Sequence, residues 1–240
     1  MNLTIGWLYG TKMNIYGDRG NILTLEQRAR WRGISVTTIE IGLGQPIPPA
    51  ADLFFFGGGQ DQEQIAVSND LQGTKGAALK AAVEDGAAML AVCGGYQLLG
   101  HEYRPHEGPI LPGIGLFDLI TEAGTERFIG NVVVDSPFGE LVGFENHSGL
   151  TTLGPALQPL GTVRVGRGNN GRDGTEGAMY RNAVGCYLHG ALLPKNPRFA
   201  DWLLTAALSR RHGTVALPAL DDTYELTAHA SAVERAMRTR

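Results

Sequence analysis

Apolar residues in the first hundred positions fall into short runs that polar and glycine-containing segments separate. Residues 3–9 and 34–41 are rich in β-branched and aromatic side chains, and each run has the length of a strand. Residues 52–59 and 87–93 contain uninterrupted apolar runs, which are typical of strands buried on both faces of a parallel sheet. The pattern therefore predicts four strands before residue 94.

Helical patterns lie between these strands. Residues 22–33 read as a helix that Gly33 closes, and residues 74–86 read as a second helix that ends at Gly86. A third helix is predicted to start with GGYQLLG, directly after the strand at 87–93. Because strands alternate with helices, we predict an α/β fold with an open, mostly parallel sheet flanked by helices.

The pattern of apolar and polar residues changes after residue 100. Residues 115–190 contain short strand-like segments separated by turn signals, which predict an antiparallel extension of the fold. Within them, residues 166–177 hold five glycines and are predicted to form a mobile loop. The C-terminal part carries amphipathic patterns of two helices, over 198–213 and 221–238. We expect residues 1–240 to form a single domain, since no linker or repeat interrupts the sequence.

Composition narrows the class of protein. Hydrophobic residues make up 43% of the chain and charged residues 18%, so the chain can bury a core. Of its 34 glycines, all but Gly213 lie in residues 1–190, without the period of collagen. No apolar run reaches the length of a membrane span, and the N-terminus lacks the features of a secretory signal. A net charge of −4 with no basic block argues against nucleic-acid binding, and we expect a cytoplasmic protein without membrane insertion.

Cys93 carries the strongest chemical signal. It stands where the buried run AMLAV meets two glycines and the predicted helix. A sharp strand-to-helix turn exposes such a side chain at the carboxyl edge of a sheet, and the N–H groups of the following helix favour a thiolate. The alternative is a small buried hydrophobic residue, which is the interpretation we give to Cys186.

A thiol nucleophile needs a base, and the chain offers six histidines. His189 follows a strand-like segment and precedes a glycine, so we expect it at a sheet edge. His147, within FENHSG, is the rival candidate. No spacing of histidines or cysteines matches a metal site, and none is predicted.

Several segments together resemble one enzyme family. AVCGGYQ resembles the nucleophile elbow of class I, triad-type glutamine amidotransferases, with Ala91 in place of the first glycine. FFFGGGQDQEQ, FENHSGL and YLHG resemble the cobyric acid synthase-like branch of this class. MNIYGDRGN, over residues 13–21, resembles the GatD-type glutaminase subunits of lipid II isoglutaminyl synthases. The resemblance runs over almost the whole chain and implies the class I amidotransferase fold.

The resemblance implies a mechanism. Cys93 attacks the side-chain carboxamide of L-glutamine, and His189 activates the thiol and protonates the departing ammonia. The N–H groups of Gly94 and Gly58 would hold the oxyanion, because a glycine leaves room for the substrate to approach. Water then hydrolyses the γ-glutamyl thioester, and the ammonia passes to a partner subunit.

One position departs from the family pattern. In many relatives a glutamate two residues after the histidine orients the imidazole, but here that position is Ala191. The third member of the triad is therefore another acid of this chain, a water molecule, or a carboxylate of the partner. Glu145 is our first candidate within the chain.

Recognition of glutamine is predicted for four residues. Arg127 could pair with the α-carboxylate of the substrate, and otherwise is a solvated arginine at a strand edge. Gln97 lies one helical turn after the nucleophile and could face the substrate pocket or the solvent. Asn146 and His147 could line the site or support the turn.

The motif YGDRGN also has two interpretations. Asp18, Arg19 and Asn21 could form a turn and a helix N-cap. Alternatively, they belong to the wall of the pocket or to a contact with the partner.

The chain contains no phosphate-binding G-x-x-x-x-G-K-[ST] motif, yet amidation of a carboxylate needs ATP. We therefore expect no cofactor in this chain, and we expect ATP and a metal in a separate Mur-ligase-like, MurT-type synthetase subunit. The predicted function is a glutaminase that supplies ammonia for amidation of D-glutamate in the lipid II stem peptide, during peptidoglycan synthesis.

Three other functions compete with this prediction. The chain could be an amidotransferase subunit for a corrinoid acid, or a free-standing cysteine hydrolase of γ-glutamyl compounds. It could also be an inactive scaffold that kept the fold, although the presence of both Cys93 and His189 argues against this.

Overall fold

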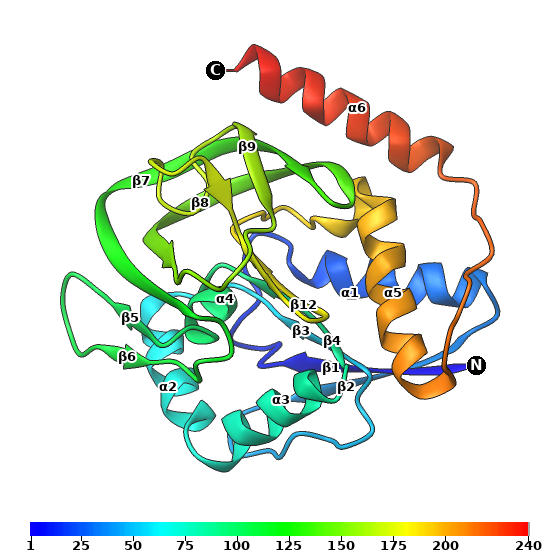
Figure 1. Ribbon diagram of the computed structural model, residues 1–240, viewed down its shortest axis with the longest axis horizontal. Helices are drawn as coiled ribbons and strands as arrows, with labels where there is room; N and C mark the ends of the chain where they lie inside the picture. Colours follow the sequence, from blue (N-terminus) through cyan, green and yellow to red (C-terminus); the bar gives the residue numbers. More distant parts are fainter. Residues whose placement is uncertain (240) are drawn as a thin grey trace.

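A computed structural model describes residues 1–239 and contains a central six-stranded sheet (Figure 1). The strand order is β11-β12-β4-β3-β1-β2, and every neighbouring pair is parallel except β11 with β12. Strands β3 and β4 are buried along their whole length, as their apolar sequences require. The strands of this sheet are β1 (Asn2–Leu8), β2 (Ser35–Ile41), β3 (Leu53–Phe56), β4 (Ala88–Val92), β11 (Ala178–Tyr180) and β12 (Ala183–Cys186).

Helices cover both sides of this sheet (Figure 1). Helix α5 contacts α1 and lies on β1, β3 and β4, whereas α2 and α3 pack together on the other side. The prediction of a mostly parallel α/β sheet flanked by helices is confirmed. These helices are α1 (Arg19–Trp31), α2 (Asp61–Leu71), α3 (Thr74–Glu84) and α5 (Pro197–His212).

A second sheet follows in the chain and is largely antiparallel, as the sequence predicts. Its main feature is the long ribbon formed by β7 and β8, whose register shifts between Ala123 and Phe128. The hydrophobic core continues from the central sheet into this ribbon. The strands are β5 (Glu102–Arg104), β6 (Leu111–Pro112), β7 (Leu119–Ser136), β8 (Gly139–Leu153), β9 (Gly161–Val165) and β10 (Thr175–Glu176).

The sequence pattern missed helix α2. This helix buries Gln64 and Ser68 beside Val67 and leaves Ile65 exposed. The two buried polar side chains are hydrogen-bonded, Gln64 to Gln97 and Ser68 to the carbonyl of Pro112. Polar residues on the buried face weaken the apolar periodicity by which a helix is recognised.

Residues 166–177 differ from the predicted mobile loop. Asn169 donates a hydrogen bond to the carbonyl of Gly177 and accepts one from its N–H. Asp173 accepts hydrogen bonds from the backbone and the hydroxyl of Thr175, which lies in strand β10. Side-chain hydrogen bonds and a short strand therefore organise this glycine-rich segment.

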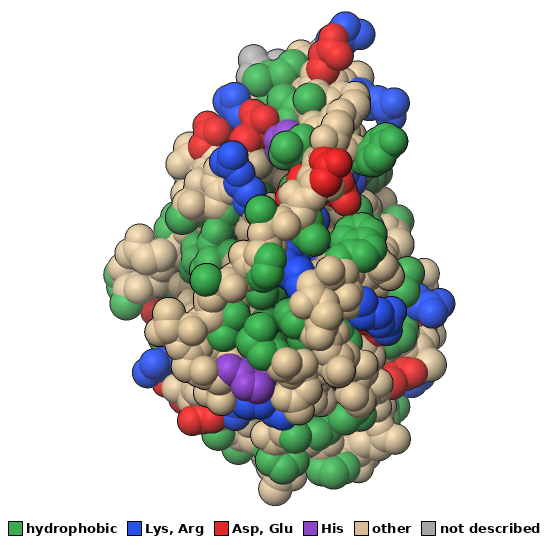
Figure 2. Space-filling view, turned by 90° about the vertical axis from the view of Figure 1, so that its right-hand side faces the viewer, with side chains coloured by type: hydrophobic (Ala, Val, Ile, Leu, Met, Phe, Trp, Pro, Cys, Tyr) green, Lys and Arg blue, Asp and Glu red, His purple; other side chains and the backbone are tan. Residues whose placement is uncertain are grey.

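The C-terminal helix α6 (Thr223–Arg238) packs across the ribbon sheet, apart from the other helices (Figure 1). Its side chain Ala236 is buried against Val133, Val142 and Val165. Figure 2 views the molecule from this side, with acidic and basic side chains interspersed near its top. Asp222 occupies the N-cap position of α6, but its side chain makes no capping hydrogen bond, and Asp221 accepts the N–H of Thr223. No helix within residues 1–239 has the length and apolar character that a membrane crossing demands.

Arg28 joins three helices. Its side chain is 2% exposed and pairs with Asp201 of α5 at 2.7 Å and with Asp222, which precedes α6, at 2.6 Å. Asp201 also pairs with Arg32 at 2.6 Å. This cluster fixes both C-terminal helices to α1, which follows the N-terminal loop.

We predict that Arg28→Ala lowers the free energy of unfolding by about 2–4 kcal/mol, because it leaves the partly buried carboxylate of Asp222 without its cation and Asp201 with Arg32 alone. Urea denaturation measures the change. The control is Arg30→Ala on the same helix, which removes an exposed pair with Glu26. The control should cost less than about 0.5 kcal/mol, and an equal loss in both variants would contradict the role of Arg28.

Candidate active site

Cys93 lies between strand β4 and the short helix α4 (Gly94–Leu98), at the carboxyl edge of the central sheet. Its backbone has φ 50° and ψ −109°, in the left-handed half of conformational space that non-glycine residues rarely adopt. Such a conformation costs about 1–3 kcal/mol and persists where the surrounding structure enforces it. The expected nucleophile elbow is therefore present at Cys93, whose side chain is nearly buried.

Close packing explains the two glycines that follow. A Cβ at Gly94 would lie 2.4 Å from Nε2 of Gln64, and one at Gly95 would lie 2.5 Å from the carbonyl oxygen of Phe56. The N–H of Gly95 also donates to the carbonyl of Gly57 at 3.1 Å. The elbow and the glycine turn after β3 are thus held directly against each other.

His189 is fully buried beside this elbow. It lies beyond the end of β12 and exchanges two backbone hydrogen bonds with Phe144 of β8, of 2.7 and 3.2 Å. Burial favours the neutral imidazole, but the charge of the Cys93 thiolate and a hydrogen bond to Asp18 outweigh it and raise the pKa of His189 to about 10. Nε2 of His189 is buried without a hydrogen-bond partner among the described residues, and the imidazole lies within electrostatic reach of the thiol.

Asp18 supplies the acid that faces the base. Its Oδ1 lies 3.3 Å from Nδ1 of His189, and both side chains are fully buried. Its Oδ2 accepts the N–H of Gly58 at 2.7 Å. One carboxylate thus holds both the imidazole and the glycine turn.

This arrangement explains why residue 191 is small. A Cβ on Gly20, near the start of α1, would lie 2.6 Å from the Cβ of Ala191. The N-terminal loop therefore approaches the segment after His189 closely, and it brings Asp18 to the imidazole. Asn21 also connects helix α1 to the segment after His189, because its Oδ1 accepts a hydrogen bond from the N–H of Leu193 at 2.9 Å.

The position of Glu145 corrects our first choice of in-chain acid. Its carboxylate accepts the backbone N–H groups of Arg167 and Gly168, at 3.0 to 3.1 Å. It lines a separate cavity on the ribbon sheet, so its task is to hold the start of the 166–177 segment. Burial raises the pKa of Glu145, against the effect of these hydrogen bonds.

The predicted oxyanion donors differ in availability. Gly94 is the first residue of α4. Its backbone N–H therefore has no acceptor within the helix and points outward from the helix N-terminus. The N–H of Gly58 is already bonded to Asp18, so the predicted oxyanion role does not fit Gly58 in this conformation. Gly59 is the member of the glycine turn that lines the cavity.

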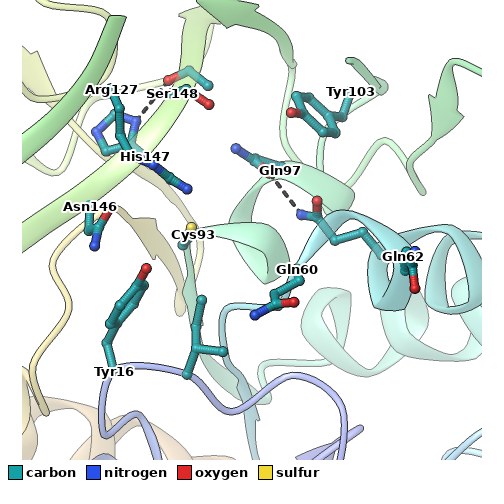
Figure 3. A pocket seen from close by; sticks show the side chains of 14 residues that line it. Tyr16, Gln60, Gln62, Cys93, Gln97, Tyr103, Arg127, Asn146, His147 and Ser148 are labelled. Atoms are coloured by element: carbon teal, nitrogen blue, oxygen red, sulfur yellow. Dashed lines mark hydrogen bonds between the residues drawn. The ribbon is translucent and has the colours of Figure 1, made fainter. Parts of the chain in front are cut away.

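A cavity of about 740 Å³ opens over the Cys93 thiol (Figure 3). Residues of the N-terminal loop, of the segment around α2, of the elbow and of the ribbon sheet surround it. Arg127 lines the cavity as predicted, and it is the only charged side chain among the lining residues that the structure describes. The lining consists of Ile15, Tyr16, Gly59, Gln60, Gln62, Gln64, Cys93, Gln97, Tyr103, Arg127, Asn146, His147, Ser148 and Gly149.

Gln97 and Asn146 also line the cavity, which is one of the two interpretations that the sequence left open for each. Gln97 is buried, accepts a hydrogen bond from Gln64 and donates one to the hydroxyl of Tyr187. Asn146 lies near Tyr16 in Figure 3, and its Oδ1 is buried without a hydrogen-bond partner in the described residues.

His147 does not have the properties of the rival base. Its ring stacks on Tyr187 with centroids 3.6 Å apart, and Nδ1 lies 2.8 Å from the carbonyl of Gly149. Burial lowers the pKa of His147 to about 3, so the imidazole is neutral and Nδ1 carries the proton that Gly149 accepts. The ring supports the wall of the cavity, while His189 has the raised pKa.

Two further groups complete the neighbourhood. Cys186 is fully buried at the end of β12, and burial raises the pKa of its thiol well above the ordinary value, as expected for a packing residue. Among the side chains that the structure describes, no three histidine, cysteine, aspartate or glutamate residues gather in a way that could hold a metal ion.

Comparisons with known proteins agree with the sequence resemblance. Residues 4–197 match the family described as the CobB/CobQ-like glutamine amidotransferase domain. The chain is 42% identical over 240 residues to the GatD subunit of lipid II isoglutaminyl synthase (glutamine-hydrolyzing) of Staphylococcus aureus strain N315, covering 99% of this chain and 98% of the relative. The GatD subunit from Streptococcus pneumoniae strain R6 is 40% identical, covering 92% of this chain and 86% of the relative.

A probable cobyric acid synthase of Methanothermobacter thermautotrophicus is 33% identical over 159 residues, which cover 60% of this chain and 31% of that protein. Among solved structures, one titled as a glutamine amidotransferase has a TM-score of 0.56 at 15% identity, covering 85% of this chain and 98% of that one. PurLQS from Thermotoga maritima has a TM-score of 0.53 at 13% identity, covering 87% of this chain and 98% of that one. The structural likeness establishes the fold, and the sequence matches establish that this chain belongs to the CobB/CobQ-like glutamine amidotransferase family.

Proposed function

We propose that this chain is the glutamine-hydrolysing subunit of a lipid II isoglutaminyl synthase. The observation that carries the proposal is the strained Cys93 beside a buried His189 whose pKa the thiolate raises. The near full-length similarity to two GatD subunits favours this acceptor over a corrinoid acid, because the cobyric acid synthase of Methanothermobacter thermautotrophicus is only 33% identical and is matched over only 31% of its own length.

The reaction begins with the thiolate–imidazolium pair of Cys93 and His189. The thiolate attacks the carboxamide carbon of L-glutamine, and the N–H of Gly94 stabilises the oxyanion, with Gly59 as the candidate for a second donor. Imidazolium donates its proton to the leaving nitrogen as the C–N bond breaks, which leaves ammonia and a γ-glutamyl thioester. Water then attacks the thioester while His189 accepts its proton, releasing L-glutamate.

Asp18 is a positioning residue in this scheme. A carboxylate at Nδ1 holds the imidazole in one orientation and stabilises its cationic form, in the manner of a catalytic triad. Because Asp18 comes from the chain itself, a carboxylate of the partner is not required to occupy Nδ1. The second carboxylate oxygen of Asp18 accepts the N–H of Gly58 and so holds the glycine turn next to His189.

The synthetase half of the reaction lies outside this chain in our proposal. Activation of the D-glutamate α-carboxyl consumes ATP, and we assign the nucleotide and its metal to a Mur-ligase-like subunit that forms a heterodimer with this chain in the cytoplasm. Ammonia released at Cys93 would pass to that subunit, where it would be consumed in amidating the lipid II stem peptide.

We predict that Cys93→Ala abolishes glutamine-dependent amidation by the complex but preserves amidation driven by added ammonium salt. The substitution removes only the nitrogen source. Both rates are measured by mass spectrometry of the lipid II product. A variant that loses both activities, while still binding its partner, would contradict the division of labour between the subunits.

We predict that His189 stays protonated at pH 8 and releases its proton near pH 10. NMR titration of the histidine side chains measures this. Cys93→Ala and Asp18→Asn should each lower the pKa of His189, because each removes a negative charge that favours the imidazolium. His147 should remain neutral throughout, and a wild-type His189 that titrates near 6.5 would contradict the ion pair.

Arg127 is expected to bind the α-carboxylate of glutamine. We predict that Arg127→Met raises the KM for L-glutamine roughly 10- to 100-fold, the range for loss of a hydrogen bond between charged groups. Steady-state release of glutamate by the complex measures it, with Arg172→Met, at an exposed position of the 166–177 segment, as control. An unchanged KM would show that the carboxylate binds elsewhere.

A further inference from the structure

The described side chains that line the cavity over Cys93 include a cation but no anion, whereas the amino-acid end of the substrate carries one charge of each sign. Free L-glutamine carries an α-carboxylate and an α-ammonium. Arg127 can satisfy the first, but no aspartate or glutamate is among the described residues that line the cavity. Neutral acceptors in this lining can receive the α-ammonium, and amide carbonyl oxygens are the strongest of them.

A chain of hydrogen bonds fixes the amide side chains on one wall. Gln64 donates from Nε2 to Oε1 of Gln97 at 2.8 Å, and Gln97 donates from Nε2 to the Tyr187 hydroxyl at 3.2 Å. The Tyr187 hydroxyl lies 2.7 Å from that of Thr151, which lies 2.7 Å from that of Thr121. Both amide orientations follow from this chain, because Nε2 of each glutamine faces an oxygen acceptor.

Within this series of hydrogen bonds, one amide oxygen accepts no hydrogen bond. Gln97 uses both ends of its amide within the wall, so its oxygen already accepts a hydrogen bond. Oε1 of Gln64 receives no hydrogen bond from the groups that the structure describes, and it is not among the polar atoms sealed from solvent. Gln64 is only 2% exposed and lines the cavity, so this oxygen is a fixed acceptor at the cavity wall.

The position of this wall selects the part of the substrate that it meets. The leaving nitrogen must face His189, which contacts the ring of Tyr16 with centroids 5.0 Å apart. Figure 3 places Gln97 on the side of Cys93 away from Tyr16. The amide wall therefore faces the amino-acid end of the substrate rather than its departing amine.

We propose that Oε1 of Gln64 accepts a hydrogen bond from the α-ammonium of L-glutamine, with Gln97 and Tyr187 holding the amide in the accepting orientation. The proposal rests on the glutaminase function proposed above. It makes Gln64 a specificity-determining residue, which selects free α-amino acid amides over amides that lack the amino group.

The test compares two substrates in the co-purified complex of this chain and its synthetase partner. L-Glutamine carries the α-amino group, whereas 4-carbamoylbutanoate has the same carboxamide and carboxylate without it. We expect Gln64→Met to lower kcat/KM for L-glutamine at least tenfold more than kcat/KM for 4-carbamoylbutanoate, because only the first substrate loses a charge-assisted hydrogen bond. Gln27→Met, on the exposed face of α1, is the matched control and should change neither value.

Gln64→Glu separates recognition from folding. A glutamate at position 64 keeps an oxygen for the ammonium in either protonation state, so the preference for L-glutamine should equal or exceed that of the wild type. If Gln64→Met does not unfold cooperatively, the glutamate variant alone decides the question. Equal losses for both substrates in the variant that folds would overturn the role of Gln64 and leave the glutaminase function intact, whereas absence of L-glutamine hydrolysis by the wild-type complex would refute both.

Discussion

A single buried carboxylate, that of Asp18, connects the parts on which the site depends. It contacts the imidazole of His189 through one oxygen and the backbone of Gly58 through the other. These groups come from the N-terminal loop, the segment after β12 and the turn after β3, which are remote in sequence. In a buried, low-dielectric setting a polar group without partners is costly, so both contacts hold Asp18 in place and keep the three segments together.

The parallel sheet determines where these segments meet. Strands β3 and β4 end at the same edge, so the glycine turn and Cys93 are neighbours, and Gly95 permits their backbones to approach. The strained backbone of Cys93 is stabilised by this packing. The ribbon of β7 and β8 then adds the opposite wall, with Arg127 and His147, above the thiol. The fold thus supplies a rigid reaction centre and a separate surface that recognises the substrate.

Much of this arrangement could be predicted from local sequence. The apolar runs identify β3 and β4, and the turn between AMLAV and GG identifies the elbow, because both signals are short-range. Asp18 could not be assigned with equal force, since it lies 171 residues from its partner and its motif also fits a helix N-cap. Glu145 was our first candidate for the third triad member, but backbone N–H groups of the 166–177 segment occupy its carboxylate. Helix α2 and Gln64 were missed because a buried polar network replaces the apolar face that periodicity detects.

The central claim is that Cys93 forms a γ-glutamyl thioester in a complex with the synthetase partner. Labelling of the complex with the glutamine-analogue electrophile diazo-oxo-norleucine, followed by peptide mass spectrometry, tests this claim most directly. The account predicts one adduct, on Cys93, which excess L-glutamine suppresses, and no adduct on the buried Cys186. Absence of any adduct on Cys93 while the partner is bound would contradict the account and favour a scaffold role for the chain.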